Sequence, residues 1–78
     1  MIYYTNGVCS KEIYIELERD TIKEVEFKAG CPGNLMGISQ LVKGMKVHEA
    51  IKRLKGIKCG TKNTSCPDQL ALALESMK

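Results

Sequence analysis

The chain has 78 residues, of which 44% are hydrophobic and 27% charged, and its formal net charge is +3. This composition is typical of a small globular protein, and at this length we expect a single domain over residues 1–78. No apolar run reaches the ~18 residues of a membrane span, and the N-terminal residues lack the basic-then-apolar pattern of a signal peptide. We therefore expect a cytoplasmic protein with no membrane partner.

The first third of the chain predicts an antiparallel sheet. Residues 11–18 and 23–29 alternate apolar and charged side chains, and residues 19–21 supply the turn of a hairpin between them. Residues 2–5 are expected to add a third antiparallel strand. The side chains expected on the inner face are Ile13, Ile15, Leu17, Val25 and Phe27. Because this face is apolar, other elements must cover it.

The rest of the chain predicts three helices, over residues 32–43, 46–56 and about 67–77. A glycine stands at the end of each of the first two, as is common at helix C-termini. The apolar stripe expected on the first helix consists of Leu35, Met36, Ile38, Leu41 and Val42. Strands segregated from helices indicate an α+β fold, in which a two- to three-stranded N-terminal antiparallel sheet packs against three C-terminal helices.

Basic charge is concentrated in the middle of the chain. Residues 43–62 carry seven basic side chains and one acidic one, whereas residues 1–42 carry four basic and six acidic ones. Such a segment could attract phosphates or an acidic protein partner, although a solvated helix face is the simpler interpretation. The segment holds no aromatic side chain on which bases could stack, which argues against nucleic-acid binding.

The candidate functional residues are the four cysteines, Cys9, Cys31, Cys59 and Cys66. In a reducing cytoplasm, cysteines are more often metal ligands, redox thiols or core residues than disulfides. Cys31 and Cys66 each precede a proline at an expected helix start, and proline suits the first helical position. The amide groups and the dipole at a helix N-terminus favour an anion such as a thiolate.

The cysteine spacing by itself leaves several interpretations open. Cys-x21-Cys-x27-Cys-x6-Cys contains no paired Cys-x-x-Cys, so it is a weak zinc signal, and cysteine is also a small core residue. Strand hairpins and helix starts can converge at one end of an α+β domain, which would bring the loop cysteines together. A metal or a second chain, including a homodimer, would stabilise so small a core.

The stretch "TSCPDQLA" (64–71) resembles the signature of the TSCPD domain, and the likeness extends through "GVCS", "FKAGCPGN" and "LVKGMKVHEAI". This domain occurs as small free-standing bacterial proteins with four cysteines and at the C-terminus of adenosylcobalamin-dependent ribonucleotide reductases. The resemblance implies an accessory role in ribonucleotide reduction and DNA synthesis, with the reductase as a partner. Free-standing members are often labelled ribonucleoside-diphosphate reductase, an oxidoreductase. Nothing in this chain offers a nucleotide pocket or a radical site, so we predict no catalytic residue.

A more distant resemblance is to iron–sulfur scaffold proteins of the NifU N-terminal-like family, and it implies an iron–sulfur scaffold-like fold. In that family three cysteines converge on a cluster or a zinc ion. Position by position, they match Cys9, Cys31 and Cys66. Lys11 stands where the scaffold has an aspartate and Ser65 where it has a histidine, which argues against assembly of a labile cluster. Cys59 would supply a fourth ligand and close the site.

These observations lead to two main hypotheses and a simpler one. The first is a metal-binding accessory domain in which all four cysteines hold zinc or an iron–sulfur cluster, as a structural centre or as a cluster scaffold or carrier. The second is a thiol–disulfide redox donor to a ribonucleotide reductase, with Cys59 and Cys66 as the natural pair. The simpler hypothesis is a small α+β protein with core cysteines, whose basic segment binds a partner.

Overall fold

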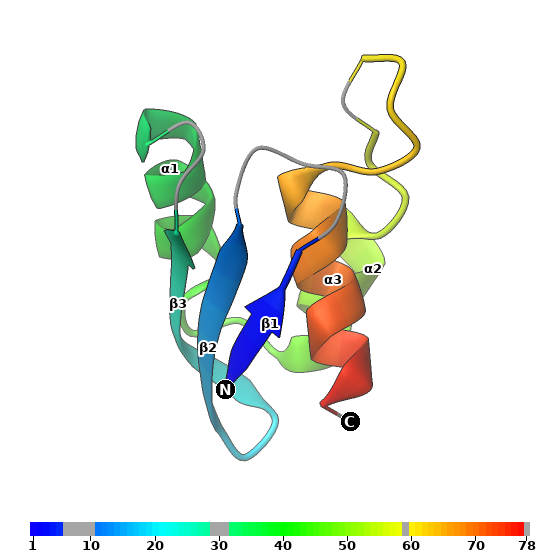
Figure 1. The fold of residues 1–78 in the computed structure, drawn as a ribbon. Coiled ribbons are helices and arrows are strands. Elements are labelled where there is room, and N and C mark those ends of the chain that lie inside the picture. Colours follow the sequence, from blue (N-terminus) through cyan, green and yellow to red (C-terminus); the bar gives the residue numbers. More distant parts are fainter. Residues whose placement is uncertain (6–10, 29–31, 59, 78) are drawn as a thin grey trace.

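Antiparallel strands precede helices along the chain in the computed structural model, which describes residues 1–5, 11–28, 32–58 and 60–77. The strands of the described residues are β1 (Ile2–Tyr4), β2 (Glu12–Glu18) and β3 (Thr21–Lys28), and they form one sheet in the order β1-β2-β3. The helices in the same ranges are α1 (Pro32–Val42), α2 (Val47–Leu54) and α3 (Cys66–Ser76) (Figure 1). The predicted α+β fold is confirmed.

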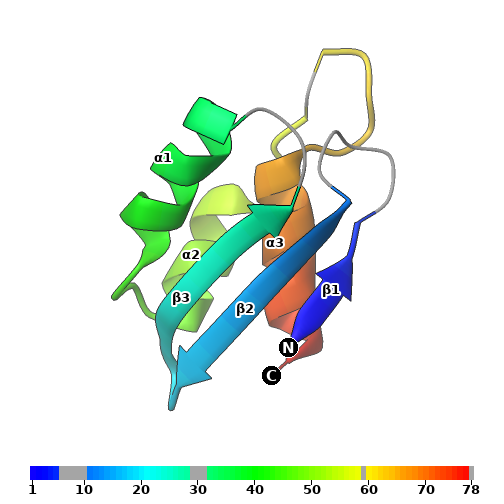
Figure 2. The same cartoon turned by 60° about the vertical axis from the view of Figure 1, so that its left-hand side comes forward.

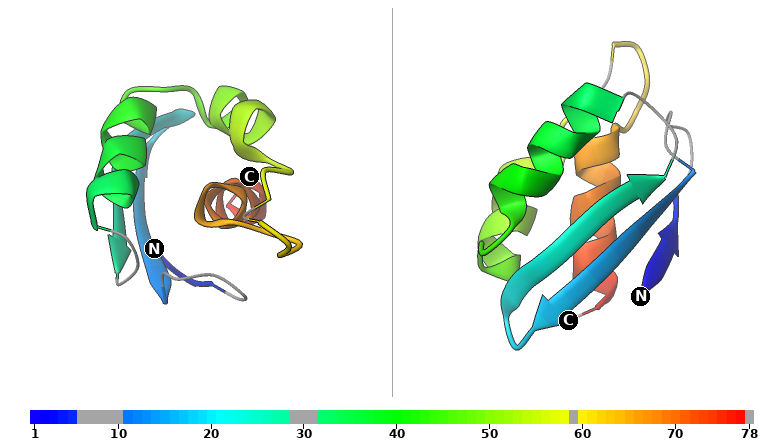
Figure 3. Two further views of the ribbon diagram at one scale, coloured as in Figure 1. Left: turned by 90° about the horizontal axis from the view of Figure 1, so that it is seen from above. Right: turned by 90° about the vertical axis from the view of Figure 1, so that its left-hand side faces the viewer.

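The hydrophobic core lies between the inner face of the sheet and helices α2 and α3, while α1 packs along β3 (Figures 2 and 3). Ile13 and Ile15 of β2 are fully buried against Leu70 and Leu74 of α3, which are fully buried as well. Successive side chains of a strand point to opposite faces. Glu16, between two inward-facing residues, is therefore exposed on the outer face.

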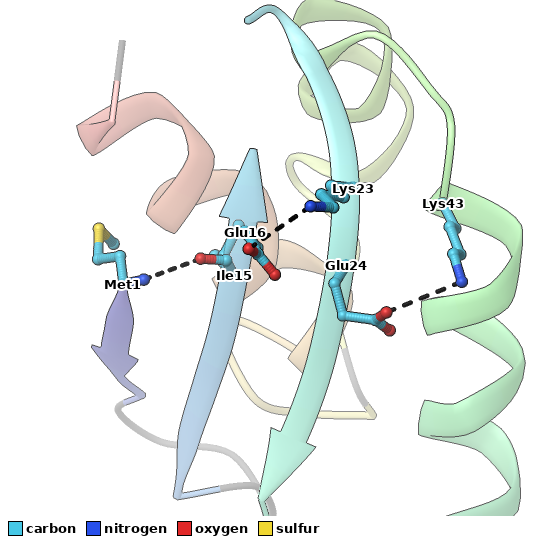
Figure 4. Close-up of polar contacts among 6 residues, drawn as sticks. All are labelled: Met1, Ile15, Glu16, Lys23, Glu24 and Lys43. Atoms are coloured by element: carbon cyan, nitrogen blue, oxygen red, sulfur yellow. Dashed lines mark hydrogen bonds and ion pairs between the residues drawn. The ribbon is translucent and has the colours of Figure 1, made fainter. Parts of the chain in front are cut away.

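The hairpin of β2 and β3 contains a β-bulge that the sequence pattern did not predict. Leu17 pairs with Ile22 where regular pairing would give it Lys23, so one residue of β3 is extra. The bulge lets both Ile22 and Val25 face the core although they are three residues apart. Lys23 lies on the outer face instead, with its ammonium 3.9 Å from the carboxylate of Glu16 (Figure 4).

The outer face of the sheet places two like charges opposite each other, since Glu16 of β2 pairs with Glu24 of β3. Like charges directly opposite in a sheet are destabilising. Each carboxylate has a lysine nearby: Lys23 lies near Glu16, and Lys43, just after α1, lies 3.7 Å from Glu24 (Figure 4). These cations offset the repulsion across the hairpin.

The turn between β2 and β3 is held against the connection between α1 and α2 mainly by the backbone. The amide of Val47 donates to the carbonyl of Asp20 at 2.7 Å, and the amide of Gly44 donates to the carbonyl of Ile22 at 2.8 Å. Gly44 has a φ of +86°, which glycine adopts without strain. On the surface, the ammonium of Lys46 lies 3.2 Å from the carboxylate of Asp20.

The predicted helices lie within two residues of those observed, and α3 begins at Cys66, one residue earlier than predicted. The predicted apolar stripe of α1 was wrong at Met36 and Leu41, which are 66% and 76% exposed. The buried side of the helix is centred on Leu35 and Val42, and the two exposed residues lie on either side of it. None of the helices in the described residues is long and apolar enough to cross a membrane.

Candidate functional site at the start of α3

Cys66 is the first residue of α3 and follows Ser65, the N-cap. The hydroxyl oxygen of Ser65 accepts a hydrogen bond from the amide of Asp68 at 3.1 Å, which satisfies one of the amides that have no partner within the helix. Pro67 follows at the second position, where the N–H it lacks would have no helical partner. The side chain of Cys66 is half-buried. The prediction that Cys66 stands at a helix N-terminus is confirmed.

Asp68 is a buried residue, only 7% exposed, and both oxygens of its carboxylate accept hydrogen bonds. The amide of Gly56 donates to Oδ1 at 2.7 Å, and the hydroxyl of Thr64 donates to Oδ2 at 2.5 Å. The side-chain amide of Gln69 donates in turn to the hydroxyl oxygen of Thr64 at 3.0 Å. Burial of a charged group is tolerated where hydrogen bonds compensate for lost hydration. The buried carboxylate therefore connects the end of α2 and residue 64 to the first turn of α3.

The hydroxyl of Ser65 provides a second connection. It donates to the carbonyl of Ile57 at 2.6 Å while it accepts from the amide of Asp68. The backbone carbonyl of Ser65 also accepts from the amide of Gln69 at 2.8 Å. Residues at both ends of the connection between α2 and α3 are thus bonded to the same helical turn.

Sequence reasoning missed the roles of Thr64, Ser65 and Asp68. A serine followed three residues later by an acid, just before an apolar run, is the capping-box pattern and could have pointed to Ser65 and Asp68. In a capping box the acid accepts from the amide of the N-cap residue, whereas Asp68 accepts from Gly56 and Thr64. Gly56 lies 12 residues away in the sequence, so a local pattern could not identify it.

Of the four predicted ligands, the structure describes Cys66, whereas Cys9, Cys31 and Cys59 lie outside the described residues. Within residues 1–5, 11–28, 32–58 and 60–77, no group of three His, Cys, Asp or Glu side chains could hold a metal ion. These ranges contain one of the four predicted ligands. The convergence of the four thiols therefore stays a prediction.

The basic segment 43–62 is partly neutralised by acids of the same chain. Four of its basic side chains form exposed ion pairs: Lys43 with Glu24, Lys46 with Asp20, Arg53 with Glu49 at 2.6 Å, and Lys55 with Glu75 at 2.9 Å. The hydrogen bond and charge of Arg53 lower the pKa of Glu49, and those of Lys46 lower the pKa of Asp20. These pairs reduce the charge that the segment presents to a partner.

An apolar hollow of about 230 Å³ lies between α1 and α2. The described residues that line it are Ile38, Leu41, Val42, Met45, Arg53 and Leu54. Arg53 is the polar member of this lining, and its guanidinium is paired with Glu49. The lining provides neither a set of metal ligands nor an acid–base pair, so the start of α3 remains the candidate site.

Comparison with known families agrees with the signature around Cys66. The family model of the TSCPD domain matches residues 1–78, the whole of this sequence. The chain belongs to the TSCPD domain family. No curated protein and no solved structure matches the chain.

The name of the TSCPD domain spells out residues 64–68 of this chain. Three of these residues, Thr64, Ser65 and Asp68, form the hydrogen bonds described above. Membership is consistent with a small accessory domain linked to ribonucleotide reduction.

Proposed function

We propose that this TSCPD domain is a metal-binding accessory domain in which Cys9, Cys31, Cys59 and Cys66 hold zinc or an iron–sulfur cluster. The observation that carries the proposal is the half-buried Cys66 in the first turn of α3. Amide groups and the dipole at that position favour an anionic sulfur. Four thiolates suit tetrahedral zinc and also suit an iron–sulfur cluster, so the donor set fits both groups.

The connection between α2 and α3 supports a shared role for two of the cysteines. Cys59 follows Ile57 by two residues in the sequence, and Cys66 follows Ser65 by one. The hydroxyl of Ser65 is bonded to the carbonyl of Ile57, so the described residues that precede the two cysteines in the sequence lie side by side. This arrangement favours a centre that takes ligands from both ends of the connection.

The size of the domain supports a structural contribution from the metal. A core of this size provides a few kcal/mol of net stability, whereas structural zinc contributes roughly 10–16 kcal/mol of apparent binding free energy in zinc-finger peptides. Even part of that free energy would stabilise the fold substantially. Membership of the TSCPD family supports an accessory role beside a ribonucleotide reductase, in which the domain would bind the reductase without catalysing the reduction itself.

Elemental analysis and a visible spectrum of anaerobically purified protein test the proposal. We expect roughly one zinc ion or one cluster per chain, the cluster coloured and the zinc colourless. Cys66→Ser should lose the metal, while Met36→Ser, which removes an exposed sulfur from α1, should retain it. Folded wild-type protein that holds no metal and has four reactive thiols would contradict the proposal. A reversible disulfide between Cys59 and Cys66 in that protein would favour the redox donor instead.

A further inference from the structure

The residues of the family signature differ in what their side chains do. Thr64, Ser65 and Asp68 form hydrogen bonds that hold residues 56 and 57 and residues 64 and 65 against the first turn of α3. We call this set of bonds the Asp68 clamp. Cys66 stands in the middle of it with a half-buried side chain. Thr64, Ser65 and Asp68 therefore hold the chain in place, whereas Cys66 carries the sulfur atom that could react or bind a metal.

We propose that Asp68 is a positioning residue for Cys66, which fixes the sulfur through the clamp without itself binding the metal. This inference rests on the proposed metal-binding function and adds a role for the acid of the signature. The clamp anchors the chain just before Cys66 at two side chains, Thr64 and Ser65. Ligands held in this way by surrounding hydrogen bonds are presented in one geometry.

The alternative is that Asp68 is itself a ligand, since carboxylates bind zinc in many proteins. Its two carboxylate oxygens already accept from the amide of Gly56 and the hydroxyl of Thr64, and the residue is buried. Turning the carboxylate toward a metal would leave those two donors without an acceptor in a site with little access to water. The geometry therefore assigns Asp68 to the support of the site.

Positioning has a measurable consequence for metal affinity. A folded protein in which the clamp is closed only part of the time binds the metal with an affinity reduced by that fraction. Asp68→Asn places an amide group where two donors need an acceptor, and Thr64→Val removes a hydroxyl while keeping the shape of the side chain. Both should lower the zinc affinity about tenfold or more, as is typical when a group that orients a metal ligand is removed.

Two matched variants serve as controls. Thr64→Ser keeps the hydroxyl and should restore the affinity of the wild-type protein to within about twofold. Glu75→Gln removes the same charge from the same helix, but its carboxylate is paired with the exposed Lys55 and does not touch the clamp. Zinc affinity is measured by competition with a chelator, at a temperature where circular dichroism shows that each variant is folded. If Asp68→Asn does not fold, Thr64→Val decides the result.

The possible results separate this inference from the proposed function. Loss of affinity in both Asp68→Asn and Thr64→Val, with both controls unchanged, supports positioning. Wild-type affinity in folded Asp68→Asn overturns it and leaves metal binding intact. Loss in Asp68→Asn with wild-type affinity in Thr64→Val also overturns it, because that pattern identifies Asp68 as a ligand.

If the wild-type protein binds no metal, the proposed function fails. The positioning of Cys66 is then tested by the reactivity of its thiol. The rate of alkylation of Cys66 is then followed by mass spectrometry of peptides from the full chain. We expect the rate to rise about tenfold in Asp68→Asn and Thr64→Val relative to Glu75→Gln, since an open clamp uncovers the half-buried sulfur. An unchanged rate in both variants overturns the inference.

Discussion

The two ends of this domain hold neighbouring chain segments together by different means (Figures 1 and 2). At the start of α3, the attachment depends on the side chains of Asp68, Thr64 and Ser65, and those of Asp68 and Ser65 are buried. At the β2–β3 turn, it depends on backbone hydrogen bonds, such as that from Val47 to Asp20, with an exposed ion pair beside them. Most residues can supply a backbone bond, whereas a buried acceptor for two donors requires a particular side chain. The sequence signature that gives the domain its name, residues 64–68, lies at the start of α3, where side chains make the attachment.

The strongest way to break this comparison is to remove one aspartate from each end. Asp68→Ala leaves the amide of Gly56 and the hydroxyl of Thr64 without their acceptor, and we expect the free energy of unfolding to fall by about 2–3 kcal/mol. Asp20→Ala removes an exposed ion pair while the backbone bonds remain, so its effect should be much smaller. Urea denaturation followed by circular dichroism measures both.

Equal losses in the two variants would contradict the comparison, because they would mean that the exposed turn depends on its side chain as strongly as the clamp does. A small effect of Asp68→Ala would show that water or another group replaces the carboxylate. Both variants are compared in the same buffer and with the same metal content, since a bound metal would stabilise the folded state by mass action.

The two serines at the ends of α3 sharpen the comparison within one helix. Ser65→Ala removes the N-cap oxygen and the donor to Ile57, and we expect a loss of about 1–2 kcal/mol in the free energy of unfolding. Ser76→Ala removes a hydroxyl that donates to the carbonyl of Ala73 in the last turn, and its effect should be smaller. Thermal unfolding of the two variants gives the difference. A larger loss for Ser76→Ala would contradict the role assigned to the N-terminal end.

Local patterns predicted most of the fold because its strands and helices follow their own periodicity. Alternation over residues 11–18 placed Ile13 and Ile15 in the core correctly. The bulge was missed because it depends on how β3 pairs with β2, which puts Lys23 outside. Met36 and Leu41 were misplaced because α1 buries a narrower side than its apolar residues suggested.

The candidate site shows the same limit. The position of Cys66 at a helix start could be predicted, because a proline just before an apolar run is a local signal for the first turn of a helix. The partners of Asp68 could not, because the amide of Gly56 reaches the carboxylate only after α2 and α3 have packed. Polar residues just before a helix and an acid in its first turn indicate a cap, whereas tertiary packing decides which donors the acid accepts from.

The smallest expected effect concerns pH and the exposed turn. The hydrogen bond and charge of Lys46 lower the pKa of Asp20 below the usual value of about 3.9. A carboxyl whose pKa is lowered on folding stabilises the folded state above its unfolded pKa, and this stabilisation disappears as the pH falls through the folded pKa. Wild-type protein should therefore exceed Asp20→Asn slightly in stability at pH 7, and the difference should disappear as the pH falls through the lowered pKa of Asp20. Lys46→Met should show the same pH profile as Asp20→Asn, and high salt should reduce the difference at pH 7. A difference that persists at pH 2 would mean that Asp20 holds the turn through something other than its charge, and the contrast between the two ends of the domain would then be weaker than the ion pair suggests.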